Sequence, residues 1–398
     1  MTRERRPRSL EARATFMGYR RPDGRVGVRN HTLVLPTSEL LNRVAEMVGD
    51  AVPAAVAVTH HPTSTGAVRD FQLRVLAGFA SNPNVGAALL VGLGEDELEV
   101  ELRERVGARS GATVELHTLR AAGSVERLAA EVGERAAELC ASLAAVPREP
   151  APVSSLVVGT ECGGSDAFSG LSANPAVGEA VDALVAEGAT ALLCELPELI
   201  GAEHLLARRA VSVSVASQVM DAILGWERLA IEMGEDLRGA QPSPGNQAGG
   251  LTTVEEKALG GLTKGGTSPV VEVVGYGETP SRHGLVLMDT AGQDVEQLTA
   301  MAAGGAQVVV FTTGRGTPTA SPIAPTIKIS SNIVTAERLA EHIDIDAGPI
   351  IEGTRTRSEI ASAILAMILA VAGGEITRAE RCGQRDFALP RTAPSLVG

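Results

Sequence analysis

The densest group of chemically active side chains lies between residues 159 and 175, which read GTECGGSDAFSGLSANP. Four glycines in this segment let the backbone approach a ligand closely. The segment follows a strand-like run, and ligands of open parallel sheets bind outside the carboxyl ends of strands. We therefore predict a functional loop whose carboxylate, thiol, hydroxyl and amide groups come from Glu161, Cys162, Ser165, Asp166 and Asn174. Asn174, which precedes a proline, has the alternative role of a helix N-cap.

Lysine occurs only three times, at Lys257, Lys264 and Lys328. Lys264 lies in a Gly-rich loop, where it can neutralise a carboxylate or act as a base if it is desolvated. The alternative is a lysine that complements the dipole at a helix C-terminus, and we favour that alternative for Lys257. Lys328 lies within an apolar strand-like run, where a charge is costly unless it is paired or faces a site. The alternative is that this run is an exposed edge strand, on which a solvated lysine prevents pairing with another chain.

Arginine and histidine side chains complete the candidate set. Arg315 stands between two glycines, where its planar guanidinium can bind a carboxylate. Arg29 can meet an acidic ligand or remain solvated. His60 and His61 follow a strand-like run, and one of them, for which we choose His61, is a candidate general base or metal ligand.

The elements that position these residues follow from the hydrophobic pattern. Short apolar runs rich in β-branched residues, such as 32–35, 155–158 and 326–329, alternate with amphipathic runs such as 125–143 and 203–231. This alternation indicates parallel sheets with crossover helices. The proline-rich segment 144–154 is typical of a linker. We predict an α/β protein with two Rossmann-like parallel-sheet domains, over 17–146 and 152–390, preceded by a basic tail over 1–16.

Composition excludes several classes of protein. The chain has 398 residues, 44% of them hydrophobic, which suffices for two or three folded domains. A formal net charge of −13 and an aromatic content of 2% argue against nucleic-acid binding. There is no uninterrupted apolar run long enough for a membrane span. Four cysteines without a CxxC pair, and an N-terminus without a secretory pattern, predict a cytoplasmic protein.

Several long motifs resemble the altronate/galactarate dehydratase family, the UxaA-type hydro-lyases. They are GYRRPDGRVGVRN, TECGGSDAFSGLSANPA, ELPELIGAEHLLARRA, PSPGNQAGGLTTVEEKALG, KGGTSP, LVLMDT, GGAQVVVFTTGRG and PTIKI, and they run from about Gly18 to about Glu375. The resemblance implies a lyase that removes water from an aldonate or aldarate, such as altronate or galactarate, and yields a 2-keto-3-deoxy acid. It also implies ferrous iron. The family's small SAF domain is expected on a separate subunit, because only about sixteen residues precede Gly18.

The sequence departs from the family pattern at cysteines of its N-terminal half. Thr65 stands where a cysteine would follow His61, and Glu95 stands where a cysteine would follow Gly94, whereas Cys162 remains. Hydroxyls and carboxylates favour harder cations than thiolate-bound iron. The alternatives are therefore a large subunit like that of sulfolactate sulfo-lyase, which eliminates sulfite, and a non-catalytic sugar-acid-binding or assembly subunit without the metal site. Nucleotide binding is a weaker alternative, because the glycine spacing fits no nucleotide motif.

Dehydration beside a carboxylate requires a base, an acid and a group that stabilises the enediolate. We assign catalytic roles to His61, Glu161, Lys264 and Lys328, and substrate binding to Ser165, Asp166, Asn174, Arg315 and Arg29. Cys162 is the candidate metal ligand. His61 and Glu161 are the alternative candidates for the base. A homo-oligomer is the expectation for this class of α/β chain.

Overall fold

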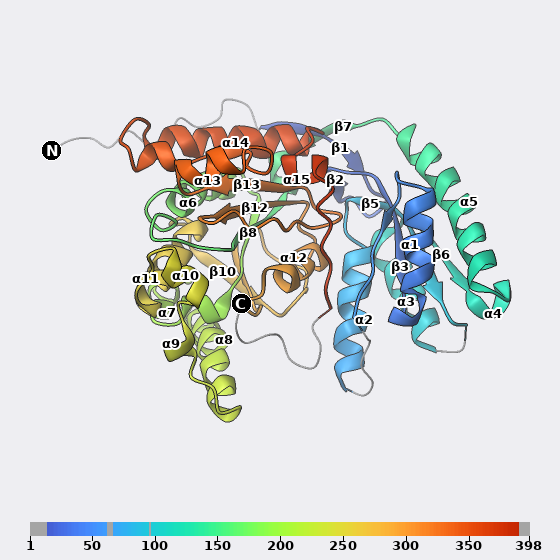
Figure 1. The fold of residues 1–398 in the computed structure, drawn as a ribbon, viewed down its shortest axis with the longest axis horizontal. Coiled ribbons are helices and arrows are strands. Elements are labelled where there is room, and N and C mark those ends of the chain that lie inside the picture. The colour runs from blue at the N-terminus through green and yellow to red at the C-terminus, as the bar shows by residue number, and fades with distance from the viewer. Residues whose placement is uncertain (1–13, 62–66, 95–96, 390–398) are drawn as a thin grey trace.

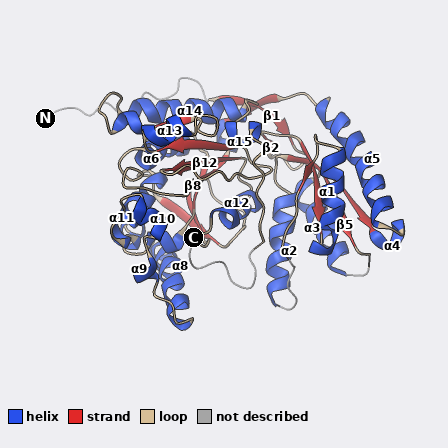
Figure 2. Ribbon diagram, in the orientation of Figure 1, coloured by secondary structure: helices blue, strands red, loops and turns tan. Residues whose placement is uncertain are grey.

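The computed structural model describes residues 14–61, 67–94 and 97–389. It contains two parallel sheets, each with helices on both faces, and a small antiparallel sheet between them (Figures 1 and 2). The predicted α/β architecture with parallel sheets is therefore confirmed. Within the described residues, no helix is both long enough and apolar enough to cross a lipid bilayer.

The N-terminal sheet has four parallel strands in the order β4-β3-β5-β6. Side chains alternate in direction along a strand, so Val34 faces one helical layer while Leu33 and Leu35 face the other. Both faces are thus buried, which explains the uninterrupted apolar run. The strands are β3 (His31–Pro36), β4 (Val56–Ala57), β5 (Val85–Gly92) and β6 (Thr113–Thr118), and the helices are α1 (Asn42–Ala51), α2 (Ala67–Ala80), α3 (Glu97–Ser110), α4 (Leu119–Ala122) and α5 (Val125–Ala144).

The C-terminal sheet has seven parallel strands in the order β10-β11-β9-β8-β12-β13-β14. Along β12 (Val308–Thr313), Val308 and Val310 pack in the core beneath α6 (Ala173–Ala186) and α14 (Arg357–Ala372). Val309 and Phe311 pack in the core that α12 (Asp294–Ala303) shares with α2. The strands are β8 (Val157–Cys162), β9 (Thr190–Leu193), β10 (Val270–Val274), β11 (Gly284–Met288), β12 (Val308–Thr313), β13 (Thr326–Ser330) and β14 (Ile345–Asp346).

The remaining helices surround this sheet. Residues 203–231, which we predicted as one helix, form two, because α7 (Glu203–Ala207) ends before Ser212 caps α8 (Val213–Glu232). The others are α6 (Ala173–Ala186), α9 (Leu237–Ala240), α10 (Pro244–Ala248), α11 (Val254–Leu262), α12 (Asp294–Ala303), α13 (Ile333–Arg338), α14 (Arg357–Ala372) and α15 (Arg378–Arg381), with short 3-10 turns η1 (Glu39–Leu41), η2 (Val153–Ser155), η3 (Leu196–Leu199), η4 (Thr263–Gly265) and η5 (Gly348–Ile350).

The small antiparallel sheet corrects two details of the sequence analysis. It is built from β1 (Thr15–Arg20), β2 (Val26–Gly27) and β7 (Glu149–Pro152), in the order β2-β1-β7. The segment 144–154 is therefore not only a linker, because its β7 pairs with the first strand of the chain. Thr15 and Phe16, which we placed in the basic tail, belong to β1, and Phe16 is buried. Residues 1–13 of that tail lie outside the described residues.

The order of strands places a topological switch point between β8 and β12. The chain leaves β8 toward β9 on one side and leaves β12 toward β13 on the other, so the loops after β8 and β12 diverge. They stay in contact at their bases, where the amides of Gly314 and Arg315 donate to the Gly164 carbonyl at 3.2 and 3.0 Å. This edge of the sheet is where a ligand is expected.

Candidate metal centre and adjoining pocket

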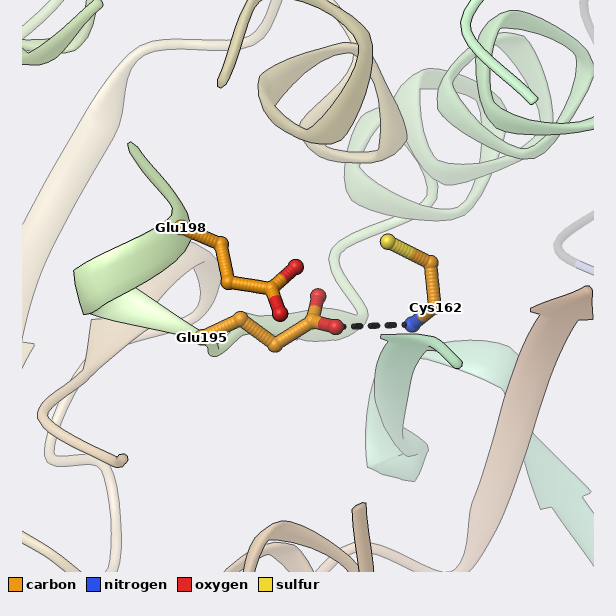
Figure 3. A group of neighbouring side chains, drawn as sticks. All are labelled: Cys162, Glu195 and Glu198. Carbon is orange, nitrogen blue, oxygen red and sulfur yellow. Dashed lines mark hydrogen bonds between the residues drawn. The ribbon is translucent and has the colours of Figure 1, made fainter. Parts of the chain in front are cut away.

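Three buried side chains converge at the carboxyl edge of the seven-stranded sheet (Figure 3). Cys162 is the last residue of β8, Glu195 follows the neighbouring strand β9, and Glu198 lies in η3. Their ligand atoms all lie within 4.8 Å of one another. Because β8 and β9 are adjacent and parallel, both strands deliver their following residues to the same edge.

The backbone at Glu195 is held in an unusual conformation. Its φ is +68°, which makes it the one non-glycine residue with positive φ in the described parts of the chain. Such a conformation costs on the order of 1–3 kcal/mol and persists only where surrounding contacts enforce it. Thr290, after β11, provides one of these contacts, since its hydroxyl oxygen accepts a hydrogen bond from the Glu195 amide at 2.9 Å. This backbone conformation places the Glu195 carboxylate beside Cys162, and the Cys162 amide donates to Glu195 Oε1 at 3.0 Å.

Each carboxylate of the triad is paired with a buried lysine of its own. Lys264, in η4, forms an ion pair with Glu195. The Nζ of Lys257, on α11, lies 2.8 Å from Glu198 Oε1 and also donates to Gln241 and Asn246. Glu198 Oε2 is buried, and no described residue provides it with a hydrogen bond. Lys257 is therefore not a lysine at a helix C-terminus, which corrects the interpretation that we favoured for it.

A pocket of about 240 Å³ opens beside the triad. Its walls are the loop after β8, the start of α6 and helix α11, and both Cys162 and Lys257 line it. Ser165, Asp166 and Asn174, three of the predicted substrate-binding residues, line it. The pocket is thus where the predicted loop and the carboxylate–lysine pairs meet.

Two of these lining residues also organise the loop itself. Asp166 Oδ1 accepts from the Ser169 amide and from the Ser331 hydroxyl, and Oδ2 accepts from the Asn332 side chain, so this carboxylate ties the loop to the end of β13. Asn174 is not a helix N-cap, because α6 already begins at Ala173. Its side chain instead accepts from the Thr312 hydroxyl at 2.6 Å.

Glu161 and Lys328 face the opposite side of the sheet from the pocket. They flank Phe311 on three neighbouring strands, β8, β12 and β13, and the Lys328 Nζ lies 3.2 Å from the centre of the Phe311 ring. Both Glu161 oxygens and the Lys328 Nζ are buried without a hydrogen-bond partner among the described residues. Lys328 is therefore not an exposed guard of an edge strand. Asp294, at the start of α12, is a nearby counter-charge for Lys328 and a nearby like charge for Glu161.

Burial shifts the pKa values of this second group strongly. Burial, and next the negative charge of Asp294, raise the pKa of Glu161 well above its ordinary value, which favours the protonated carboxyl. Burial lowers the pKa of Lys328 to about 7, against the opposing effect of Asp294. Burial, and next the charge of Glu198, raise the pKa of Asp294 to about 6. Such perturbed groups cluster at functional sites more often than elsewhere.

The other predicted site residues are separate from the triad. Arg315 is exposed at the loop after β12, and its Nη1 donates to the Gly245 carbonyl at 2.8 Å. His61 is exposed after β4, in the N-terminal domain, and the residues 62–66 that follow it, Thr65 included, lie outside the described residues. Glu95, the other replacement of a family cysteine, lies outside them too.

Arg29 has a structural role, which corrects its assignment to substrate binding. Its guanidinium makes a bidentate ion pair with Glu380, and its remaining donors bind the carbonyls of Val28, Val371 and Glu375. All five N–H groups are thus used inside the protein. The residue joins the N-terminal segment to α14 and α15.

Sequence reasoning missed the two carboxylates of the triad. Glu195 and Glu198 stand directly after the strand-like run 190–194, in the sequence ELPEL. The signal that could have found them is their place at the carboxyl end of the run that follows 155–158 in the chain. Sequential strands of a parallel sheet are commonly neighbours, so this position alone would have predicted that the two acids approach Cys162.

Comparison with known proteins places the chain in a family. The family model described as D-galactarate/altronate dehydratase, C-terminal, matches residues 153–395, and the one described as D-galactarate dehydratase/altronate hydrolase, second domain, matches residues 18–144. This chain belongs to the D-galactarate/altronate dehydratase family. The resemblance noted in the sequence is thereby confirmed.

Three curated relatives of the family show how far the similarity extends. The (2R)-sulfolactate sulfo-lyase subunit beta of Chromohalobacter salexigens is 37% identical over 95% of this chain and 97% of its own length. The altronate dehydratase of Bacillus subtilis is 33% identical over 98% of this chain and 80% of its own. The galactarate dehydratase (L-threo-forming) of Escherichia coli is 36% identical over 91% and 73%. These relatives are dehydratases and a sulfo-lyase, which places the chain among the lyases.

The triad fits a divalent metal. One thiol and two carboxylates provide three ligands, and the unpartnered Glu198 Oε2 is a free buried acceptor that a cation would satisfy. Thiolate with carboxylate oxygens suits a borderline transition ion better than magnesium or calcium, which prefer oxygen alone. Three protein ligands leave coordination positions open for a substrate.

Proposed function

We propose that this chain is the large subunit of a sugar-acid dehydratase, which eliminates water from an aldonate or aldarate, such as altronate or galactarate, to give a 2-keto-3-deoxy acid. The observation that carries the proposal is the Cys162–Glu195–Glu198 triad, with its two lysines, at the wall of a pocket in a member of this family. Ferrous iron is the metal that we propose for the triad, following the family resemblance.

The pocket offers the groups that this elimination needs. A divalent metal bound to the triad would supply Lewis acidity, which stabilises the enediolate formed beside the substrate carboxylate. Lys257 and Lys264 add fixed positive charge at the same place, where developing negative charge is stabilised best. Ser165 and Asn174 line the pocket and are our candidates for binding substrate hydroxyls. Arg315, on the loop after β12, has donors beyond the one that the Gly245 carbonyl accepts and is our candidate for binding a carboxylate.

The proton transfers are assigned to Glu161 and His61 as candidates. Glu161 directly precedes Cys162, on the opposite face of β8, and burial with the nearby charge of Asp294 raises its pKa well above its ordinary value, so it is our candidate acid. His61, after β4, remains the candidate base. Lys328 contributes its charge from the far side of β12.

A second candidate function is that of a sulfo-lyase large subunit. The observation that favours it is the match over 97% of the length of a subunit named for sulfolactate sulfo-lyase, against 73–80% for the named dehydratases. Both reactions begin with the loss of a proton beside a carboxylate, and they differ in the group that then leaves, which is water in one and sulfite in the other. We propose, on the same match, that this chain works with a small partner subunit carrying the family's SAF domain.

A turnover screen tests the proposal. The full chain is mixed under anaerobic conditions with ferrous iron and a SAF-domain partner, and it is offered altronate, galactarate, other aldonates and aldarates, and 3-sulfolactate. We expect 2-keto-3-deoxy acid from one of the sugar acids, and sulfite from sulfolactate would select the second candidate instead. If no acid reacts although acids raise the melting temperature, the chain is a binding subunit and the proposal is wrong.

A further inference from the structure

The pairing of each triad carboxylate with its own ammonium bears on how a metal can bind. Lys264 pairs with Glu195, and Lys257 pairs with Glu198 at 2.8 Å. All four side chains are less than a tenth exposed, so solvent and salt screen their charges little. Two ammonium groups therefore balance the two carboxylates of the triad before any metal binds.

A divalent metal disturbs this balance. Cys162 must ionise to become a ligand, and its proton leaves the site. The two charges of the metal exceed the single charge of the thiolate, so the loaded triad with its lysines carries one net positive charge. Asp294, the next carboxylate, has Lys328 as its own counter-charge on the other face of the sheet. An uncompensated charge in a buried site is strongly unfavourable. An anion that enters the adjoining pocket would compensate it.

The pocket is placed to admit such an anion. Both Cys162 and Lys257 line it, so a bound carboxylate can approach the metal and an ammonium at once. The Lys257 ammonium is held by Glu198, Gln241 and Asn246, and it is therefore fixed in position and cannot swing away when the metal enters. Its charge stays at the site in the loaded state.

We propose that Lys257 and Lys264 are positioning residues that make the triad bind a divalent metal tightly only together with an anionic ligand in the pocket. The inference rests on the proposed function for the class of anion, a sugar acid or sulfo-acid, but it does not require turnover. A triad without the lysines would attract a metal by itself. With them, the protein takes up its metal in the presence of substrate.

Cobalt binding tests this in the full chain. Co²⁺ is titrated into the protein with and without galactarate, altronate or 3-sulfolactate. Binding is followed by the absorption of Co²⁺ bound to a thiolate, and the concentration of free Co²⁺ is corrected for the Co²⁺ that the acid itself binds. We expect at least about tenfold tighter Co²⁺ binding in the presence of one of these acids, since a single unscreened charge is compensated. Equal affinity with and without every acid would overturn the inference.

Lysine variants separate this effect from a merely structural role. Lys257→Met leaves Glu198 without its cation, so it should bind Co²⁺ about tenfold more tightly than wild type without acid, and the acid should add little. Co²⁺ alone should also raise the melting temperature of this variant more than that of wild type. Lys264→Met is the second variant if the first does not fold. Arg357→Met, which removes a surface cation that pairs with Glu179, is the control and should keep the full effect of the acid.

The outcomes distinguish this inference from the proposed function. Coupled binding that Lys257→Met abolishes, without turnover of any acid, supports the inference and contradicts the proposed function. If an acid is turned over but neither the acid nor Lys257→Met changes the Co²⁺ affinity, the proposed function is supported and the inference is contradicted. Weaker Co²⁺ binding by Lys257→Met would also overturn the inference, because it would show that the ammonium helps the metal to bind.

Discussion

The Cys162 amide donates to Glu195 Oε1 at 3.0 Å, across the ends of the neighbouring strands β8 and β9. This bond fixes the carboxylate beside the thiol of the same cysteine. The other oxygen of Glu195 meets Lys264, so both of its oxygens are held before a ligand arrives. Such preorganisation of a ligand set is what a catalytic metal site requires.

Replacing Glu195 by glutamine should weaken metal binding. The Glu195→Gln side chain keeps its size but loses the charge that a divalent ion requires, and Lys264 then faces a neutral amide. We expect Co²⁺ affinity, measured with a sugar acid present, to fall by at least about 10–100-fold. Glu179→Gln is the matched control, because Glu179 pairs with Arg357 at the surface and should leave the affinity unchanged. An equal affinity in both variants would exclude Glu195 as a ligand.

Thr290 should matter through the backbone of Glu195. Thr290→Val removes the acceptor of the Glu195 amide in a buried position, which should lower the free energy of unfolding by about 1–3 kcal/mol. It should also weaken metal binding, since the positive φ of Glu195 then lacks one of its supports. Thr290→Ser keeps the hydroxyl and should retain most of the metal affinity. If both variants bind metal like wild type, the strained turn does not depend on this bond.

Lys328 should destabilise the protein at neutral pH. Burial lowers the pKa of Lys328 to about 7 in the folded state, whereas the ordinary value is 10.5, so the unfolded chain binds more protons between these values. The contribution of this group to stability therefore rises as the pH increases from about 7 toward 10.5. Lys328→Met should raise the free energy of unfolding by about 1–4 kcal/mol at pH 7 and flatten that rise. Urea denaturation at pH 7 and pH 9.5 measures both, and a less stable variant at pH 7 would contradict the prediction.

Arg29 should affect stability but not substrate binding. Arg29→Lys keeps the charge but cannot satisfy Glu380 and three carbonyls at once, so the melting temperature should fall by several degrees. Once a substrate is known, KM of the folded variant should remain near that of wild type. A rise in KM without a loss of stability would restore the substrate-binding role that the sequence suggested.

Much of the scaffold could be predicted because it depends on local patterns. Runs such as His31–Pro36 and Val85–Gly92 are largely apolar on both faces, and sheets covered by helices on both sides require this. Strand β7 was missed, since a short proline-containing segment resembles a linker until its partner β1 is known. Helix α12 was missed because its ten residues are almost all buried and show no polar face.

The site could be predicted only where its residues share one segment. The loop after β8 gave Cys162, Ser165 and Asp166, because their types and glycines occur together. Glu195 and Glu198 depend on the pairing of β8 with β9, which no local pattern reports. Arg29 was misassigned for a related reason, since all but one of the groups that use its donors lie more than 340 residues away in the chain.

The most direct test of the account is X-ray absorption at the iron edge of the protein loaded anaerobically with ferrous iron and a sugar acid. We predict one sulfur neighbour among oxygen neighbours, and loss of that sulfur in Cys162→Ser, because the triad provides one thiolate and two carboxylates. Iron without a sulfur neighbour, or an identical spectrum in Cys162→Ser, would contradict the assignment of Cys162, Glu195 and Glu198 as the metal centre of this lyase.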